Sequence, residues 1–119
     1  MQGSAAAALC SEMLRSVRNT EVQTKEYPVE KKTEGAEPRI GVFVCHCGIN
    51  IASVVDVEKV SKYIETLSGV VHAEHALYTC SQDTQERIKK VIEEKNLNRV
   101  IVASCTPRTH ESLFQETLR

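Results

Sequence analysis

Five cysteines are the residues of this sequence best suited to chemistry, and four of them follow one pattern. Cys45 and Cys47 come directly after a short β-branched segment, Cys80 follows a second such segment, and Cys105 follows a third. Thiolates are soft ligands for zinc and for iron–sulfur clusters, and paired thiols also exchange disulfides. These residue types predict a metal or redox site. Whether they form one site depends on the elements that position them.

The sequence from residue 39 onward alternates between strand and helix patterns. Segments 40–44, 70–78 and 100–103 are rich in β-branched residues and predict strands. Apolar residues at helical spacing predict a helix after each strand, with start signals at Asp56, at Ser81 and at Thr106, which precedes a proline. The order βαβαβα with short connections predicts a parallel sheet in a small three-layer α/β unit.

The helix ends and one core face are also predictable. Gly69 and Asn96 follow the first two of these helices and are expected to end them. The last helix is expected to pack against the core through Leu113, Phe114 and Leu118.

The N-terminal third differs in pattern from the rest of the chain. Residues 1–18 predict a helix, with Ser4 as its N-cap and an alanine-rich first half, and Cys10 is expected to pack there as a small apolar residue. Residues 19–38 lack apolar periodicity and alternate in charge, which predicts a linker. We expect the α/β domain to occupy 39–119 and to continue in sequence beyond this chain.

The predicted sheet brings the cysteines together. The carboxyl ends of parallel strands lie at one edge of a sheet, where open α/β folds place their ligands. Helix N-termini meet the same edge, and their partial positive charge favours thiolates. Gly48, directly after Cys47, is expected to let the backbone turn sharply and approach a bulky cofactor. We therefore expect Cys45, Cys47, Cys80 and Cys105 to form a single site.

The cysteine spacing leaves three kinds of site open. Successive cysteines are separated by one, 32 and 24 residues, whereas structural zinc modules usually present knuckles with two to four intervening residues. The spacing also differs from the compact cysteine run of bacterial ferredoxins, so it favours an iron–sulfur cluster only modestly. A zinc-stabilised interaction domain and a thiol–disulfide redox module remain alternatives, although the C-x-x-C thiol motif is absent.

The histidines and the arginine near the cysteines have both a functional and a structural interpretation. His46 lies between two cysteines and is a candidate to tune a cofactor, or else a surface histidine bonded to backbone. Arg108 and His110 follow Cys105 and are candidates to stabilise negative charge at the site, or else belong to a solvated first turn. His72 and His75 are expected to face opposite sides of the sheet and to be structural.

Bulk properties exclude several classes of function. The formal charge is −1 with both signs interspersed, so a nucleic-acid partner is not expected. No apolar run approaches the length of a membrane span, and no secretory signal pattern opens the chain. A cytoplasmic location is therefore expected, where cysteines serve as metal ligands or redox thiols more often than as structural disulfides.

Three blocks, at 41–48 (GVFVCHCG), 78–81 (YTCS) and 97–111 (LNRVIVASCTPRTHE), together resemble a known family. They are similar to the N-terminal iron–sulfur domain of the heterodisulfide reductase A subunit and its bacterial relatives, and the similarity covers about residues 39–119. The opening residues 2–8 resemble, over a shorter stretch, the last helix of the family's flavin domain. The resemblance thus implies a segment of a longer, fused protein.

The resemblance also implies a function. The family consists of FAD-containing iron–sulfur oxidoreductase subunits of anaerobic metabolism, which pass electrons between partner subunits. It implies that Cys45, Cys47, Cys80 and Cys105 bind a [4Fe-4S] cluster, with other subunits of a heterodisulfide reductase-like complex and ferredoxin or hydrogenase-type donors as partners. FAD would belong to the full-length protein, because this chain contains no glycine-rich dinucleotide fingerprint. The chain alone is not expected to be catalytically complete.

Overall fold

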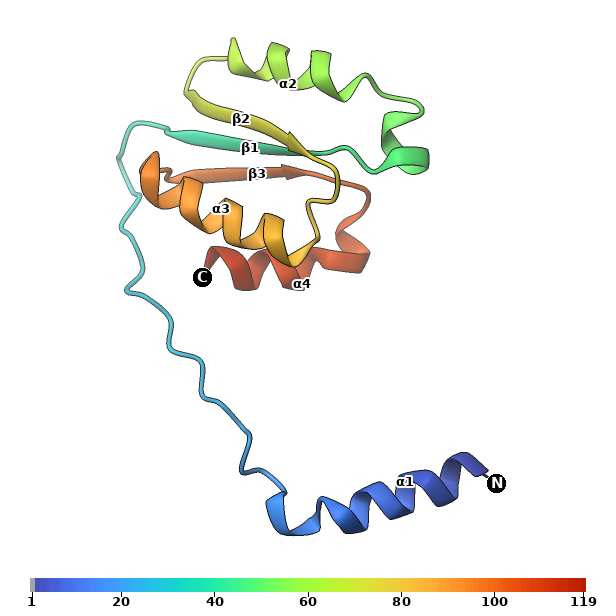
Figure 1. The fold of residues 1–119 in the computed structure, drawn as a ribbon. Helices are drawn as coiled ribbons and strands as arrows, with labels where there is room; N and C mark the ends of the chain where they lie inside the picture. The colour runs from blue at the N-terminus through green and yellow to red at the C-terminus, as the bar shows by residue number, and fades with distance from the viewer. Residues whose placement is uncertain (1) are drawn as a thin grey trace.

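The structure is a computed structural model that describes residues 2–119, and its three strands form one parallel sheet (Figure 1). The strands are β1 (Ile40–Cys45), β2 (Val70–Ala76) and β3 (Arg99–Ala103), in the spatial order β2-β1-β3. Both neighbours pair with β1 in parallel. The predicted alternation of strands and helices and the predicted parallel sheet are therefore confirmed.

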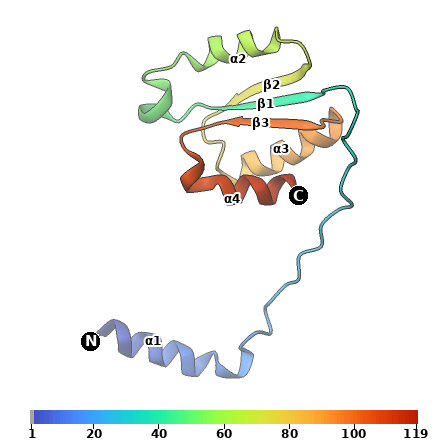
Figure 2. The ribbon, with the colours of Figure 1, turned by 180° about the vertical axis from the view of Figure 1, so that it is seen from behind.

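Helices cover both faces of the sheet, which makes the unit three-layered. α2 (Val57–Glu65) lies on one face, whereas α3 (Gln82–Glu94) and α4 (Pro107–Leu118) lie on the other, as the two opposite views show (Figures 1 and 2). Right-handed crossovers through helices are the usual connection between parallel strands. This arrangement puts β1 in the middle of the molecule.

Two clusters of buried apolar residues lie on opposite faces of the sheet, and β1 contributes residues to both. Val42 and Val44 point toward α2 and cluster with Val57 and with other buried residues. Phe43 points the other way and clusters with residues of α3, and it is 1% exposed. Alternate residues of a strand face opposite sides of the sheet, so a strand covered on both faces is apolar throughout.

Side-chain caps begin the three helices at the predicted residues. The carboxylate of Asp56 accepts a hydrogen bond from the Lys59 N–H at the start of α2. Ser81 caps α3 and Thr106 caps α4, each through its hydroxyl oxygen. These caps satisfy amide groups that have no partner within the helix, and they fix the positions where the chain leaves the strand-end loops.

The turns that end the first two of these helices also follow prediction, but the end of β2 and the loop after β1 differ from it, and β1 and β3 are each one residue longer than predicted. Gly69 has φ +81° and Asn96 has φ +48°, a left-handed conformation in which the chain leaves a helix. β2 ends at Ala76 instead of residue 78, because the chain turns after its last pairing with Cys45. The loop after β1 contains a single π-helical turn at Gly48–Ala52, which the sequence pattern did not predict.

The N-terminal helix lies apart from the sheet in both views (Figures 1 and 2). α1 runs Gln2–Met13, and a 3₁₀ turn follows at Arg15–Val17. Ser4 therefore lies inside the helix, so its prediction as N-cap is wrong; helix-favouring alanines follow it, and the helix extends back past it. Cys10 is exposed, so its predicted packing is also wrong, because no described element covers α1 there. Met1, the first residue of the predicted 1–18 helix, lies outside the described residues.

The last helix packs on the core through only part of its predicted face. Phe114 packs against the cluster around Phe43, and Leu113 is half-buried. Leu118 is 45% exposed, so its assignment to the core is wrong. It lies in the final turn of α4, beyond the part of the helix that the described core covers.

Among residues 2–119, no helix is both long enough and apolar enough to cross a membrane.

Gly41 is required by close packing in the centre of the sheet. A Cβ atom at this position would lie 2.3 Å from Cδ1 of Leu97, whose side chain is 2% exposed. We expect Gly41→Ala to lower the free energy of unfolding by about 1 to 3 kcal/mol, because the buried leucine must move out of its packed position. Urea unfolding of the metal-free chain measures the effect.

Gly48→Ala is the matched control, since nothing lies within 4 Å of a Cβ built there. Equal stabilities of the two variants would contradict the packing argument.

Candidate functional site

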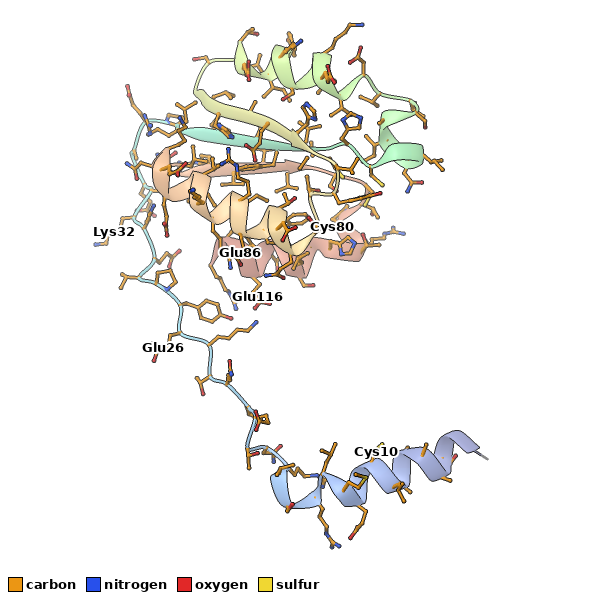
Figure 3. The ribbon with its side chains drawn as sticks, in the orientation of Figure 1. Cys10, Glu26, Lys32, Cys80, Glu86 and Glu116 are labelled. Carbon is orange, nitrogen blue, oxygen red and sulfur yellow. The ribbon has the colours of Figure 1, made fainter. Side chains whose placement is uncertain are left out.

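The ends of the three strands bring the four predicted cysteines to one edge of the sheet. Cys45 is the last residue of β1, opposite Ala76 at the end of β2, and Cys47 lies two residues farther on. Cys80 follows the end of β2 and Cys105 follows the end of β3. Figure 3 shows Cys80 close to the start of α3, whereas Cys10 lies far away on α1.

Cys45 is the buried member of the set, with 2% of its surface exposed. Burial raises the pKa of its thiol, but hydrogen bonds from the backbone and hydroxyl of Thr79 and from the hydroxyl of Ser104 outweigh it, so the pKa lies below its ordinary value. Thr79 directly precedes Cys80, and Ser104 directly precedes Cys105. The sulfur of Cys45 therefore lies where all three strand-end loops meet.

A chain of buried polar side chains holds these loops in place. The Thr79 hydroxyl donates to the Ser104 hydroxyl oxygen at 3.1 Å, which joins the loops after β2 and β3. Gln85 of α3 donates through its amide nitrogen to the Thr79 carbonyl, and its amide oxygen accepts from the Thr117 hydroxyl of α4 at 2.6 Å. Thr79 and Gln85 are almost completely buried. Because buried polar groups are costly to leave unpaired, this series of hydrogen bonds strongly favours one arrangement of the loops.

Cys105 is exposed and lies beside the first turn of α4. The backbone N–H of Thr106 donates to its sulfur, the Thr109 hydroxyl lies in hydrogen-bond contact with it, and the Ser104 hydroxyl donates to it; these contacts lower the pKa of the thiol. The Thr109 oxygen lies 3.9 Å from this sulfur, and the Ser104 oxygen lies 4.0 Å from it. A helix N-terminus with free N–H groups stabilises a thiolate in this position.

Cys47 lies at the start of the π-helical turn. The amide nitrogen of Asn50 lies 3.7 Å from its sulfur, within reach of a weak N–H···S hydrogen bond. Cys47 and Cys80 are both partly buried. The turn thus gives this sulfur a nearby donor, as the other loops do for Cys45 and Cys105.

The four sulfurs are not arranged as a ready-made ion site. Across residues 2–119, no group of three or more His, Cys, Asp or Glu side chains is close enough to hold a metal ion. The chemistry of the donor set nevertheless suits an iron–sulfur cluster: soft thiols come from three adjoining loops, and hydroxyl or N–H donors surround at least three of them. A cluster is larger than a single ion and needs more widely separated ligands.

His46 pairs with a histidine that the sequence analysis considered structural. Nδ1 of His46 lies 3.3 Å from Nδ1 of His75, and the ring centroids are 5.3 Å apart. The register explains the pairing, because the His46 N–H donates to the Ala76 carbonyl and so extends the sheet by one residue. No sequence spacing predicts this contact, since it depends on how β1 and β2 align. His72 instead bonds Glu74 at 2.9 Å, so the two strand histidines have different partners.

The remaining candidates make few contacts. Arg108 is exposed and His110 is half-buried in the first turns of α4. Gly48 begins the π-helical turn, and nothing lies within 4 Å of a Cβ atom built on it. The best-defined depression, about 360 Å³, borders His46 and the segment 52–58, and none of the four cysteines lines it.

The hydrogen bonds around Cys105 predict how the reactivity of its thiol depends on pH. In the metal-free chain we expect the pH profile of its alkylation by iodoacetamide to have its midpoint below that of an ordinary thiol, because the thiolate is the reactive form. Thr109→Val removes one donor and should move the midpoint to higher pH. Peptide mass spectrometry follows Cys105, with the exposed Cys10 in the same sample as an internal control. Identical midpoints in wild type and variant would contradict the assigned hydrogen bond.

Comparison with known proteins gives one consistent result. The chain is 56% identical over 79 residues, or 66% of its length, to the second iron–sulfur A subunit of the CoB–CoM heterodisulfide reductase of Methanopyrus kandleri. It is 54% identical over 80 residues, or 67% of its length, to a protein of Archaeoglobus profundus named as similar to the heterodisulfide reductase A subunit. It is 52% identical over 86 residues, or 72% of its length, to the A subunit of the H₂:CoB–CoM heterodisulfide, ferredoxin reductase of Methanothermobacter marburgensis. No protein-family profile matches the chain.

The chain spans only 11 to 13% of the length of these relatives. The relatives are named as subunits of reductases or as similar to one, and one of these names specifies an iron–sulfur subunit. The identity is high and recurs in several archaeal proteins, as the resemblance in the sequence predicts. Over about two thirds of its length, this chain belongs to the family of heterodisulfide reductase A subunits.

Proposed function

We propose that the α/β domain, residues 39–119, binds a [4Fe-4S] cluster and relays single electrons through it. The proposed ligands are Cys45, Cys47, Cys80 and Cys105. The observation that carries the proposal is that β1 ends at Cys45 while Thr79 and Ser104, the residues directly preceding Cys80 and Cys105, are hydrogen-bonded to each other at 3.1 Å. Three segments remote in sequence thus present sulfur ligands to one edge of the sheet.

The chain's own residues would bind the cluster and control its surroundings. When bound by these cysteines, the cluster would supply one-electron redox chemistry between a donor and an acceptor. The hydrogen bonds to Cys45 and Cys105 favour the thiolate forms needed for ligation. Cys45 is buried, which would limit the access of water to the cluster. Cys105 is exposed, which would give an electron a short path to a partner protein.

In the whole protein, we propose that this domain is one relay within a larger oxidoreductase subunit. The names of several relatives mention ferredoxin, which supports ferredoxin as a donor or acceptor of the complex. FAD would be held by sequence outside this chain, with α1 adjoining a flavin domain and 19–38 linking it to the cluster domain. His46 and Gly48 would border the cluster. The other subunits of a heterodisulfide reductase-like complex are its proposed partners.

Anaerobic purification followed by metal and sulfide analysis tests the proposal. The chain reconstituted with ferrous iron and sulfide should contain about four irons and about four sulfides per chain, and the protein should show broad absorption at about 400 nm. One zinc per chain in place of iron would support an interaction domain instead. Colourless, metal-free protein that forms a disulfide would contradict the cluster and favour thiol exchange.

Serine substitutions test the ligand set. Each of Cys45→Ser, Cys47→Ser, Cys80→Ser and Cys105→Ser should lose about half or more of the bound iron, because serine is a poor substitute for a thiolate. Cys10→Ser is the matched control and should retain wild-type iron, since Cys10 is exposed on α1. A full complement of iron in one of the four variants would remove that residue from the ligand set.

A further inference from the structure

Thr79 is the most deeply buried hydroxyl residue at the edge of the sheet that carries the cysteines. It is 0% exposed, and its hydroxyl lies 3.1 Å from that of Ser104. Its carbonyl accepts from Gln85, which is 2% exposed. A threonine in a fully buried position is usually retained for its hydrogen bonds, because a hydroxyl without partners is costly there.

The two hydroxyls have fewer protons than acceptors. Thr79 and Ser104 carry one hydroxyl proton each; the Thr79 hydroxyl donates to the Ser104 oxygen, and the Ser104 hydroxyl donates to the Cys105 sulfur at 4.0 Å. An anionic thiolate is a better acceptor than a neutral hydroxyl. Because the Ser104 oxygen already accepts from Thr79, the Ser104 proton is directed toward the sulfur of Cys105.

The supporting scaffold prevents these donors from moving away. Gln85 is anchored at its other end by the Thr117 hydroxyl at 2.6 Å, so α3 and α4 together hold the Thr79 backbone. The side chains of Thr79, Gln85 and Ser104 are all at least partly buried. Donors held in this way need no rearrangement when charge increases at a nearby group.

We propose that Ser104 donates a hydrogen bond to the Cys105 sulfur of the cluster, that Thr79 holds the Ser104 hydroxyl in this orientation, and that these two positioning residues raise the reduction potential of the cluster. The inference rests on the proposed cluster, and it names residues that influence the reduction potential of that cluster. The reduced cluster carries one more negative charge than the oxidised cluster. Hydrogen bonds to its sulfur ligands therefore stabilise the reduced form more than the oxidised form.

Thr79→Val tests the inference, because valine keeps the shape of threonine and lacks the hydroxyl. The 119-residue chain and its variants are reconstituted anaerobically with ferrous iron and sulfide, and the midpoint potential is measured by redox titration with electron paramagnetic resonance of the reduced cluster. We expect a shift to lower potential, with an about fivefold smaller ratio of reduced to oxidised cluster at the wild-type midpoint, as expected from the loss of one hydrogen bond. Thr79→Ser restores a hydroxyl and should restore most of the wild-type potential.

Thr66→Val is the matched control. Thr66 lies at the end of α2, and its hydroxyl donates to the Tyr63 carbonyl, so this variant should keep the wild-type potential. A Thr79→Val protein with a full cluster and the wild-type potential would overturn the inference while leaving the proposed cluster intact. A shift in Thr79→Val that Thr79→Ser does not reverse would also overturn it, since the effect would then come from packing.

Ser104→Ala covers the case in which Thr79→Val fails to fold or to bind iron. Ser104 is less buried than Thr79, and the alanine variant removes the second hydroxyl. A lower potential in Ser104→Ala supports the inference, and an unchanged potential overturns it. Wild-type protein that binds no cluster would overturn the proposed function, and this inference with it.

Discussion

The parallel pairing of β1 with both of its neighbours is the constraint on which the rest of the structure depends. β1 hydrogen-bonds along its length to β2 and to β3, and the shared direction places all three carboxyl ends at one edge. Antiparallel pairing of either neighbour would move Cys80 or Cys105 to the opposite edge. The chemistry of the site is thus a consequence of strand direction, which the helical crossovers impose.

Packing at the centre of the sheet makes this pairing specific. β1 is covered on both faces, with Val42 and Val44 against α2 and Phe43 against α3. A one-residue slip of β1 would exchange the residues on these two faces, and it would also move Gly41 away from its close contact with Leu97. The register that buries the apolar residues is the same register that ends β1 at Cys45.

Polar contacts then arrange the loops beyond the strands. Sheet pairing brings the loops to one edge, but it does not decide how they lie relative to one another. A series of hydrogen bonds runs from α4 through α3 to the loops after β2 and β3, and it joins Thr117, Gln85, Thr79 and Ser104. It ends beside the sulfurs of Cys45 and Cys105. The helices on one face of the sheet therefore hold the donors that surround these thiols.

The sequence by itself determined the alternation of strands and helices, the caps at Asp56, Ser81 and Thr106, and the position of four cysteines at or just after the strand ends. These features depend on local periodicity and local hydrogen bonds, which neighbouring residues specify. Only the tertiary structure decided that His46 pairs with His75 and that Thr79 donates to Ser104. It also left Cys10 and Leu118 exposed, against expectation. Such contacts join segments about 25 or more residues apart, and they depend on register and packing that no local pattern contains.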